Sequence, residues 1–218
     1  MPEINLMALY PSGKGRAADR PTITEEDKRI SKQFDRDYFD GDRRHGYGGY
    51  SYHPRFWTDT VRHIRDHYGL AEDAAILDIG CAKGFMLRDF QLLMPQARLA
   101  GMDVSSYAIE NALEPVKHLV REENAKSLPY ADKSFDLVLA INTIHNLSEE
   151  DCKNSLREIA RVSRRNAFVM VDAYRTEEQR EAMLRWVLTA ETMLSVDQWL
   201  ELFVAANYTG DYFWWTVE

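Results

Sequence analysis

The strongest constraint on the fold is an alternation of two kinds of segment that begins near residue 74. Between short apolar runs, apolar residues recur every three or four positions, as they do on one face of a helix. The apolar runs themselves stand at residues 74–79, 97–104, 135–141 and 167–173, and residues 118–124 predict a weaker strand between the second and third of them. Strands that are apolar along their whole length are typical of a parallel sheet with helices on both faces. The pattern therefore predicts an α/β fold, one doubly wound and mostly parallel sheet.

The residues around this unit follow other patterns. Residues 1–23 predict an extended arm, and "TEED" from Thr24 predicts a capped helix that runs to about Phe34. The stretch "DYFDGDRRHGYGGYSYH" has no period and predicts a structured loop, after which Pro54 suits the first turn of another helix. We therefore expect an N-terminal helical and aromatic cap. At the other end, two helical stretches and a last strand in "DYFWWTVE" complete the sheet edge.

Composition narrows the classes of partner. The 218 residues hold 35 acidic and 27 basic side chains, a formal net charge of −8, which disfavours a nucleic acid partner. No apolar run predicts a membrane span, and the first residues lack the layout of a secretory signal. The two cysteines form no disulfide or zinc pattern, and no grouping of ligating residues predicts a metal. We expect a cytoplasmic protein.

The first predicted strand ends in "ILDIGCAKGF", which places an acid and two glycines where a strand passes into a helix. Gly80 and Gly84 let the backbone approach a ligand beyond the carboxyl ends of the strands, where such sheets bind ligands. The dinucleotide fingerprint fits poorly, because Ala82 and Phe85 occupy two of its glycine positions. The pattern acid-x-G-x-G-x-G fits better, with Ala82 in place of one glycine and Asp78 as the acid.

A second acid supports a ligand site here. Asp103 ends the second predicted strand, 25 residues after Asp78. A carboxylate in this place can accept hydrogen bonds from both hydroxyls of a ribose. The plainer interpretation of either acid alone is a helix cap or a local ion pair. The prediction of a ligand site therefore depends on Asp78 and Asp103 both standing at strand ends.

Three stretches resemble the class I S-adenosylmethionine-dependent methyltransferases. "ILDIGCAKG" is similar to the first motif of that family, and "GMDVSSYAIENA" to its second strand with the ribose-binding acid. "NAKSLPYADKSFDLVLAINTIHNL" resembles the segment that runs from the adenine-contacting residue to the fourth strand. Its part "SLPYADKSFDLV" is typical of the small-molecule branch that includes quinone-pathway methyltransferases. The resemblance covers roughly residues 50–210 and implies a Rossmann-like fold, methyltransferase activity and S-adenosyl-L-methionine as the cofactor.

The resemblance also implies roles for particular residues. The turn would face the amino-acid part of the cofactor, Asp103 would hold the ribose, and Asn124 with the Ala125 amide would meet the adenine. Asn142 would lie near the methionyl end, and Arg55 could pair with the cofactor carboxylate. The predicted cofactor-binding residues are Asp78, Gly80, Cys81, Ala82, Gly84, Asp103, Val104, Ser105, Asn124, Ala125, Asn142, Tyr50 and Arg55.

Two departures from the family pattern have expected consequences. Ala82 stands where the family often has glycine, and we expect slightly tighter packing there. "TGDYFWWTVE" leaves room for one strand after the fifth, where the family usually has two. Cys81 is interpreted as a small side chain in a tight turn rather than a nucleophile.

The aromatic loop and one histidine are the candidates for roles beyond cofactor binding. "YGGYSYHPRFW" predicts a glycine-hinged lid that closes over the cofactor, the alternative being an aromatic cluster that packs the N-terminal helices onto the sheet. His145 follows the fourth strand and is the predicted general base. The alternative is a loop histidine hydrogen-bonded to the backbone. Asp172 and Tyr174, at the end of the fifth strand, are the second choice.

These patterns predict a domain of residues 54–218 that binds S-adenosylmethionine, preceded by a cap of residues 1–53. The expected function is methyl transfer to a small-molecule acceptor, with a carbohydrate-derived hydroxyl as the leading candidate because the loop resembles methyltransferases of sugar and surface-polysaccharide pathways. If the acceptor is an amine or a carboxylate, no base is required. The alternatives are a nicotinamide-dependent oxidoreductase of the same fold class and a non-catalytic cofactor-binding partner.

Overall fold

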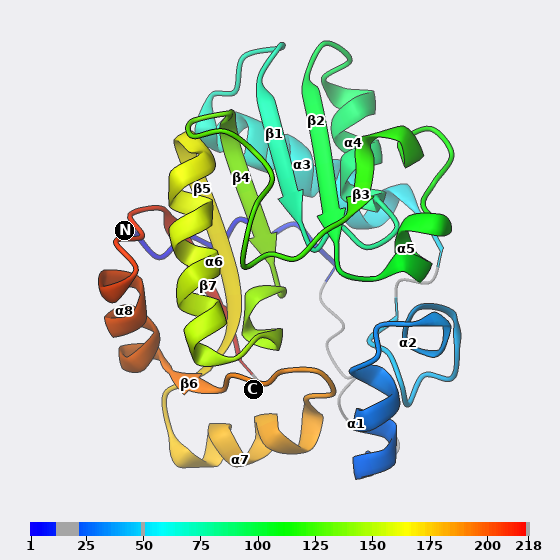
Figure 1. Ribbon diagram of the computed structural model, residues 1–218, viewed down its shortest axis with the longest axis vertical. Coiled ribbons are helices and arrows are strands. Elements are labelled where there is room, and N and C mark those ends of the chain that lie inside the picture. The colour runs from blue at the N-terminus through cyan, green and yellow to red at the C-terminus, as the bar shows by residue number, and fades with distance from the viewer. Residues whose placement is uncertain (12–21, 49–50, 217–218) are drawn as a thin grey trace.

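The computed structural model describes residues 1–11, 22–48 and 51–216 (Figure 1). Tyr50, one of the predicted cofactor-binding residues, lies outside the described residues. The predicted N-terminal arm falls partly outside them as well, so only residues 1–11 and 22–23 of the arm are described.

The strands form a single parallel sheet. They are β1 (Ala75–Ile79), β2 (Arg98–Asp103), β3 (Val120–Glu122), β4 (Phe135–Ile141), β5 (Ser163–Tyr174), β6 (Leu194–Ser195) and β7 (Asp211–Trp215). Their order is β3-β2-β1-β4-β5-β6, with β7 also paired with β5, and each of these pairs is parallel. The chain order reverses between β1 and β4, so the ligand crevice of a doubly wound sheet lies at their carboxyl ends. The predicted fold class is confirmed.

Two helices start as predicted, one capped by Thr24 and one with Pro54 in its first turn. The helices are α1 (Glu25–Ser31), α2 (Arg36–Asp40), α3 (Pro54–Tyr68), α4 (Phe85–Leu93), α5 (Ser106–Glu110), α6 (Glu149–Val162), α7 (Glu177–Trp186) and α8 (Val196–Ala205), with the 3₁₀ turns η1 (Lys117–Leu119) and η2 (Ile144–Asn146). Thr24 and Asp27 form a complete capping box on α1, and Ser148 caps α6. Gly69 ends α3 in the left-handed conformation that favours glycine.

Alternate residues of the central strands face two cores. On one face, Leu77, Val138 and Val169 pack with the buried residues of α6 and α8, and on the other Ile76, Leu139 and Phe168 pack with those of α3 and α4. Figure 1 accordingly shows α6 in front of the sheet and α3 behind it. Both faces are buried, which explains why these strands are apolar along their whole length.

Three boundaries differ from the sequence expectation. α1 ends at Ser31 rather than near Phe34, because Phe34 adopts a positive φ of 49° that a helix cannot contain. The predicted loop begins with the short helix α2, capped by Asp35, which is too short to show a period. Two strands rather than one follow β5, because β6 has only two residues and leaves no pattern in the sequence.

The N-terminal elements form a cap over the carboxyl edge of the sheet. Figure 1 shows α1, α2 and α7 beyond the ends to which the central strands point. The first residues lie elsewhere: the Ile4 amide donates to the Tyr212 carbonyl, and the Tyr212 amide donates to the Pro2 carbonyl. Residues 2–4 thus extend the sheet beside β7, and Leu6 is fully buried against the core of α3 and α4.

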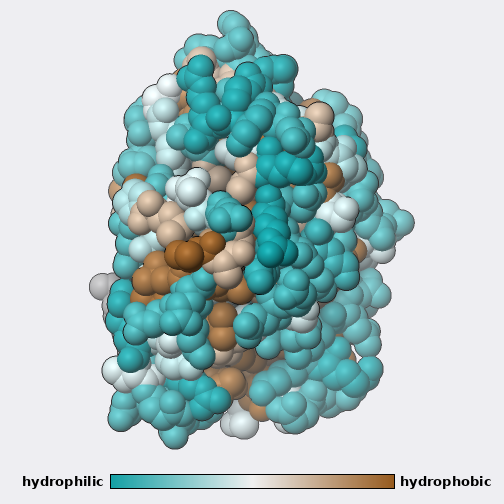
Figure 2. All heavy atoms as spheres, turned by 60° about the vertical axis from the view of Figure 1, so that its left-hand side comes forward, coloured by the Kyte–Doolittle hydropathy of each residue, from teal (hydrophilic) through white to brown (hydrophobic). Residues whose placement is uncertain are grey.

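The face of the molecule on the α8 side is largely hydrophilic (Figure 2). Figure 2 turns the α8 side of the molecule forward and shows hydrophobic side chains gathered near the middle of a hydrophilic face. Val204 of α8 is among the exposed hydrophobic residues. Within the described residues, no helix is both long enough and apolar enough to span a bilayer.

Candidate functional site

The turn between β1 and α4 is built from residues in the left-handed conformation. Gly80, Ala82 and Gly84 have φ values of +78°, +48° and +77°. A Cβ atom on Gly80 would lie 2.1 Å from Thr143 Oγ1, and one on Gly84 would lie 2.9 Å from Val116 Cγ2. The amides of Gly80 and Cys81 both donate to the Met102 carbonyl, at 2.7 and 2.9 Å, which ties the turn to β2. The two glycines are therefore required by the backbone conformation and by close neighbours.

Ala82 is strained rather than merely crowded. We expected tighter packing at this position, but its φ of +48° shows that the penalty lies in the backbone. An alanine in this region costs roughly 1–2 kcal/mol, whereas glycine loses only about 0.4–1 kcal/mol more entropy on folding. The substitution Ala82→Gly is therefore expected to raise the free energy of unfolding by about 0.5–1 kcal/mol. Urea denaturation of the two proteins measures this difference, and a less stable glycine variant would contradict it.

Two carboxylates lie at the carboxyl ends of β1 and β2. Asp103 accepts hydrogen bonds from the Ala82 amide at 2.8 Å and the Ser105 amide at 2.9 Å. Asp78 is buried, and the described residues give its side chain neither a hydrogen bond nor an ion pair. Burial and the nearby charge of Asp103 raise the pKa of Asp78 to about 8. Burial also raises the pKa of Asp103, against the opposing effect of its amide hydrogen bonds. No basic side chain of residues 1–11, 22–48 or 51–216 forms an ion pair with either acid.

The remaining predicted cofactor residues lie along the same edge of the sheet. Val104 is 51% exposed beyond β2, whereas Ser105 is buried, caps α5 and donates to the Phe34 carbonyl. Asn124 follows β3, where its Oδ1 accepts from the Lys126 amide, and Ala125 beside it is buried. Asn142 is exposed just after β4, with a φ of +52°. The hydroxyl of Ser105 is thus already hydrogen-bonded. Asn124 and Asn142 place amide side chains at this edge of the sheet.

Cys81 and Arg55 are placed less favourably for the roles considered. Burial raises the pKa of the Cys81 thiol well above its ordinary value, which agrees with its interpretation as a small buried side chain. Arg55 is exposed at the start of α3, and its guanidinium lies 4.6 Å from the centre of the Phe56 ring. The described contacts give Arg55 no link to the turn.

His145 does not fit the predicted role of general base. It is buried in η2, and its Nδ1 accepts a hydrogen bond of 3.0 Å from the Asp172 amide. Since an accepting ring nitrogen carries no proton, the neutral ring holds its proton on Nε2. Such a ring can donate, but neither nitrogen is free to receive a proton. The geometry matches the alternative interpretation, a loop histidine bonded to the backbone. Asp172 is also buried, and burial raises its pKa against the opposing effect of His145.

Comparison with known proteins shows which family the residues at this edge of the sheet belong to. Residues 77–171 match the family model described as "Methyltransferase domain". The chain carries a class I methyltransferase domain. The sequence resemblance is thereby confirmed for the central strands and the turn.

Relatives of this methyltransferase domain differ in what they act on. The chain is 31% identical over 115 residues to a malonyl-[acyl-carrier protein] O-methyltransferase of Legionella pneumophila, a match that covers 51% of this chain and 40% of the relative. It is 27% identical over 133 residues to a tRNA (carboxymethyluridine(34)-5-O)-methyltransferase of Arabidopsis thaliana, over 60% and 31% of the two chains. The chain thus spans less than half the length of these curated relatives.

One solved structure with the same fold is named for a reaction other than methyl transfer. The [4+2]-cyclase SpnF aligns with a TM-score of 0.57 at 23% identity, over 78% of this chain and 61% of the other. At this identity the likeness concerns the fold alone. The methyltransferase domain must therefore be judged by its own residues.

Those residues fit S-adenosylmethionine. The turn excludes Cβ atoms at Gly80 and Gly84, and the buried Asp78 side chain has no hydrogen-bond or ion-pair partner in the described part of the chain. The cofactor carries a positively charged sulfonium and an amino group, and a cation is what a pair of buried acids requires. When bound, it supplies a methyl group that is already activated by the sulfonium. Among the described residues, no group of three or more metal-ligating side chains occurs.

Sequence reasoning missed a contact between the cap and the turn of the methyltransferase domain. Lys83 Nζ lies 2.5 and 2.6 Å from the two carboxylate oxygens of Asp40, the last residue of α2. The Tyr107 hydroxyl of α5 also donates to Asp40 at 2.8 Å. Burial alone would raise the pKa of Asp40, but the bonds from Lys83 and Tyr107 outweigh it and lower the pKa. The position of Lys83 between two glycines does not indicate which acid it pairs with, because Asp40 lies 43 positions away in the sequence.

This contact predicts a large effect of one neutral substitution in α2. Asp40→Asn removes the carboxylate that pairs with the buried Lys83 ammonium, so we expect a loss of about 2 kcal/mol in the free energy of unfolding. This is less than the roughly 3–5 kcal/mol for a fully buried pair, because the Asp40 side chain remains 29% exposed. The matched control is Asp37→Asn on the same helix, whose side chain is 56% exposed. Urea denaturation measures both, and equal losses would contradict the prediction.

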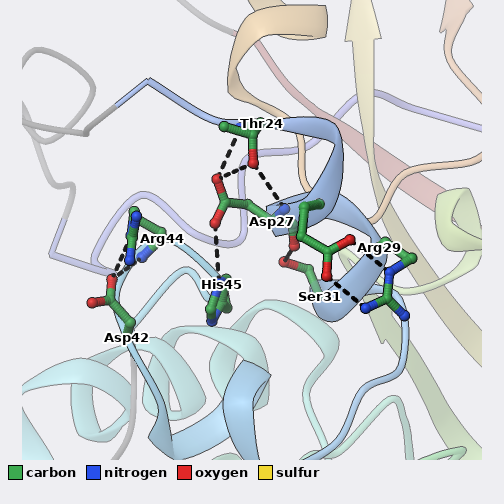
Figure 3. Close-up of polar contacts among 8 residues, drawn as sticks. Thr24, Asp27, Arg29, Ser31, Asp42, Arg44 and His45 are labelled. Carbon is green, nitrogen blue, oxygen red and sulfur yellow. Dashed lines mark hydrogen bonds and ion pairs between the residues drawn. The ribbon is translucent and has the colours of Figure 1, made fainter.

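The cap also contains a buried acid, Asp27, which contacts a histidine. Asp27 accepts hydrogen bonds from both the amide and the hydroxyl of Thr24, and His45 Nε2 lies 3.0 Å from Asp27 Oδ1. Figure 3 shows the His45 ring directed at this carboxylate from the turn that also holds Asp42 and Arg44. The hydrogen bonds from Thr24 and from His45 lower the pKa of Asp27, against the effect of burial.

Proposed function

We propose that this chain uses S-adenosylmethionine to methylate a hydroxyl group of a small molecule. The observation that carries the proposal is the left-handed turn of Gly80 to Gly84 beside the unpartnered Asp78 and the edge carboxylate Asp103. In this proposal Asp103 holds the ribose, Asn124 and Ala125 meet the adenine, and Asn142 lies near the methionyl end. Residues 54–218 form the catalytic domain and residues 1–53 its cap.

The acceptor is proposed from charge and from the relatives. Both curated relatives named above are O-methyltransferases, one of them acting on tRNA. The net charge of −8 favours a small molecule over a nucleic acid in this chain. The likeness of the aromatic loop to enzymes of sugar pathways makes a carbohydrate-derived hydroxyl the leading acceptor. Two buried, unpaired cysteines support a cytoplasmic location.

Calorimetric titration with S-adenosylhomocysteine and with NADH tests the proposal. We expect binding of S-adenosylhomocysteine only, lost on Asp103→Ala. Binding of NADH alone would instead support an oxidoreductase of the same fold class. Transfer is then measured with labelled S-adenosylmethionine on a panel of sugar glycosides, phenols, carboxylates, amines and bulk tRNA. Binding without transfer to any acceptor would favour a non-catalytic cofactor-binding role.

A further inference from the structure

The cap holds a histidine whose geometry is that of an oriented base. The His45 ring is 14% exposed, and its Nδ1 is buried without a hydrogen-bond partner among the described residues. Its Nε2 faces Asp27 Oδ1 at 3.0 Å. Since an ionised carboxylate only accepts, Nε2 must carry the proton of the neutral ring. The lone pair of Nδ1 is therefore free.

This arrangement is the reverse of that at His145. The Nδ1 lone pair of His145 is taken by the Asp172 amide, whereas that of His45 meets no donor from the residues that the structure describes. Both rings hold their proton on Nε2, but only His45 can receive another one. The acid that orients His45 is itself fixed by Thr24, through bonds of 2.9 and 2.6 Å (Figure 3). A base oriented by a fixed acid is the arrangement that proton-abstracting sites use.

The segment that carries His45 is anchored on both sides of the carboxyl edge. Before it, Asp40 binds Lys83 of the cofactor turn. After it, the Tyr47 hydroxyl accepts a hydrogen bond of 2.7 Å from the Leu188 amide, which lies just beyond α7. The segment of residues 40–47 therefore runs from the turn proposed to hold the cofactor to the region just beyond α7. An acceptor bound under the cap would lie between the same two anchors.

We propose that His45 is the general base for the acceptor hydroxyl and that Asp27 is its positioning residue, an inference that rests on the proposed function. His45 Nδ1 takes the hydroxyl proton while the oxygen forms its bond to the methyl carbon. The carbon–sulfur bond breaks, and its electron pair stays on sulfur as a neutral thioether. The imidazolium keeps its Nε2 hydrogen bond to Asp27 and passes the Nδ1 proton to water that enters when the methylated product leaves. No oxidant or reductant is needed.

The first test needs no ligand. Long-range ¹H–¹⁵N correlation spectra of the full-length ¹⁵N-labelled protein distinguish a bare ring nitrogen from a protonated one, with His45→Gln used for assignment. We expect a bare Nδ1 and a protonated Nε2 for His45. Asp27→Asn is expected to move a substantial part of the proton to Nδ1, because the new amide can donate to Nε2. A proton on Nδ1 of His45 in the unsubstituted protein would overturn the proposal.

The second test separates a base from a structural histidine. In His45→Ala, transfer to methyl glucoside and catechol should fall about 100-fold or more, while the Kd of S-adenosylhomocysteine stays within about twofold. Added imidazole should restore part of the rate, which a structural role would not allow. His118→Ala, at an exposed histidine, is the matched control and should behave as the unsubstituted protein. Asp27→Asn should lower kcat far more than it raises KM.

Each contrary outcome has its own meaning. Equal rates in His45→Ala and His118→Ala would overturn the inference and leave the proposed function standing. The same holds if His45→Ala loses S-adenosylhomocysteine binding, since the residue would then be structural. Transfer to carboxylates or amines but to no hydroxyl would overturn both the base and the hydroxyl acceptor. If the unsubstituted protein binds no S-adenosylhomocysteine, the proposed function fails and the inference fails with it.

Discussion

Asp78→Asn is expected to stabilise the ligand-free protein at pH 8 and to weaken its binding of S-adenosylmethionine. The pKa of Asp78 rises from 3.8 to about 8 on folding, so between these values the folded chain holds a proton that the unfolded chain has released. Stability from this group is therefore complete below about pH 4 and is lost as the pH rises toward 8. At about 1.36 kcal/mol per pH unit, the loss between pH 5 and pH 8 is roughly 3 kcal/mol. Asparagine cannot ionise, so the variant does not lose this unfolding free energy as the pH rises.

The same substitution removes the charge that meets the cofactor. Binding of a cation favours ionised Asp78, so the affinity of the unsubstituted protein should rise with pH up to about 8. Asp78→Asn should bind about 100-fold more weakly, as expected from losing one strong charge-assisted contact, and with little pH dependence. Urea denaturation and calorimetry at pH 5, 6.5 and 8 measure both effects. Asp73→Asn, exposed before β1, is the control. Parallel stability profiles for Asp78→Asn and the unsubstituted protein would refute the assignment.

Gly80→Ala is expected to cost about 2–4 kcal/mol of unfolding free energy, more than a left-handed alanine alone costs. Its Cβ would lie 2.1 Å from Thr143 Oγ1 and 2.9 Å from Thr143 Cβ. Thr143 cannot rotate away freely, because its hydroxyl donates to the carbonyls of Ile79 and Ile141 and so joins the ends of β1 and β4. Cofactor binding should be lost with the shape of the turn.

Two further variants divide this loss into its causes. Gly69→Ala has a φ of +55° and open space around its Cβ, so it measures the conformational penalty alone, about 1 kcal/mol. The double variant Gly80→Ala with Thr143→Ala removes the two nearest atoms, Oγ1 and Cγ2, leaves the Cβ contact of 2.9 Å, and should recover part of the remainder. Thermal and urea denaturation measure all four proteins. If Gly80→Ala loses no more stability than Gly69→Ala, Thr143 does not restrict the turn.

The sheet and the turn could be predicted from the sequence because their signals are local. Continuous apolar runs predicted four of the main strands, and Thr24 and Pro54 marked helix starts that the structure confirms. Asp78 and Asp103 could be placed at strand ends by counting along the chain. β6 and α2 escaped because elements of two and five residues cannot show a period.

The contacts of the cap could not be predicted, because they join residues far apart in sequence. Lys83 with Asp40, Tyr47 with Leu188 and His45 with Asp27 depend on how the cap is seated. His145 and His45 show the same limit: both are histidines near polar residues. What separates them is one amide directed at Nδ1 of the first and none at Nδ1 of the second.

The pairing of residues 2–4 with Tyr212 has a consequence for the order of folding. The bridge joins Glu3 to Tyr212 and so closes a loop of almost the full 218 residues. A contact of such high sequence separation has a large loop-closure entropy and forms late unless other contacts first bring its ends together. On the ribosome it must wait until β7 has emerged. The edge of β7 and the pocket of Leu6 are then the last parts of the sheet to close, and in the nascent chain the parts most open to chaperones and to wrong strand pairing.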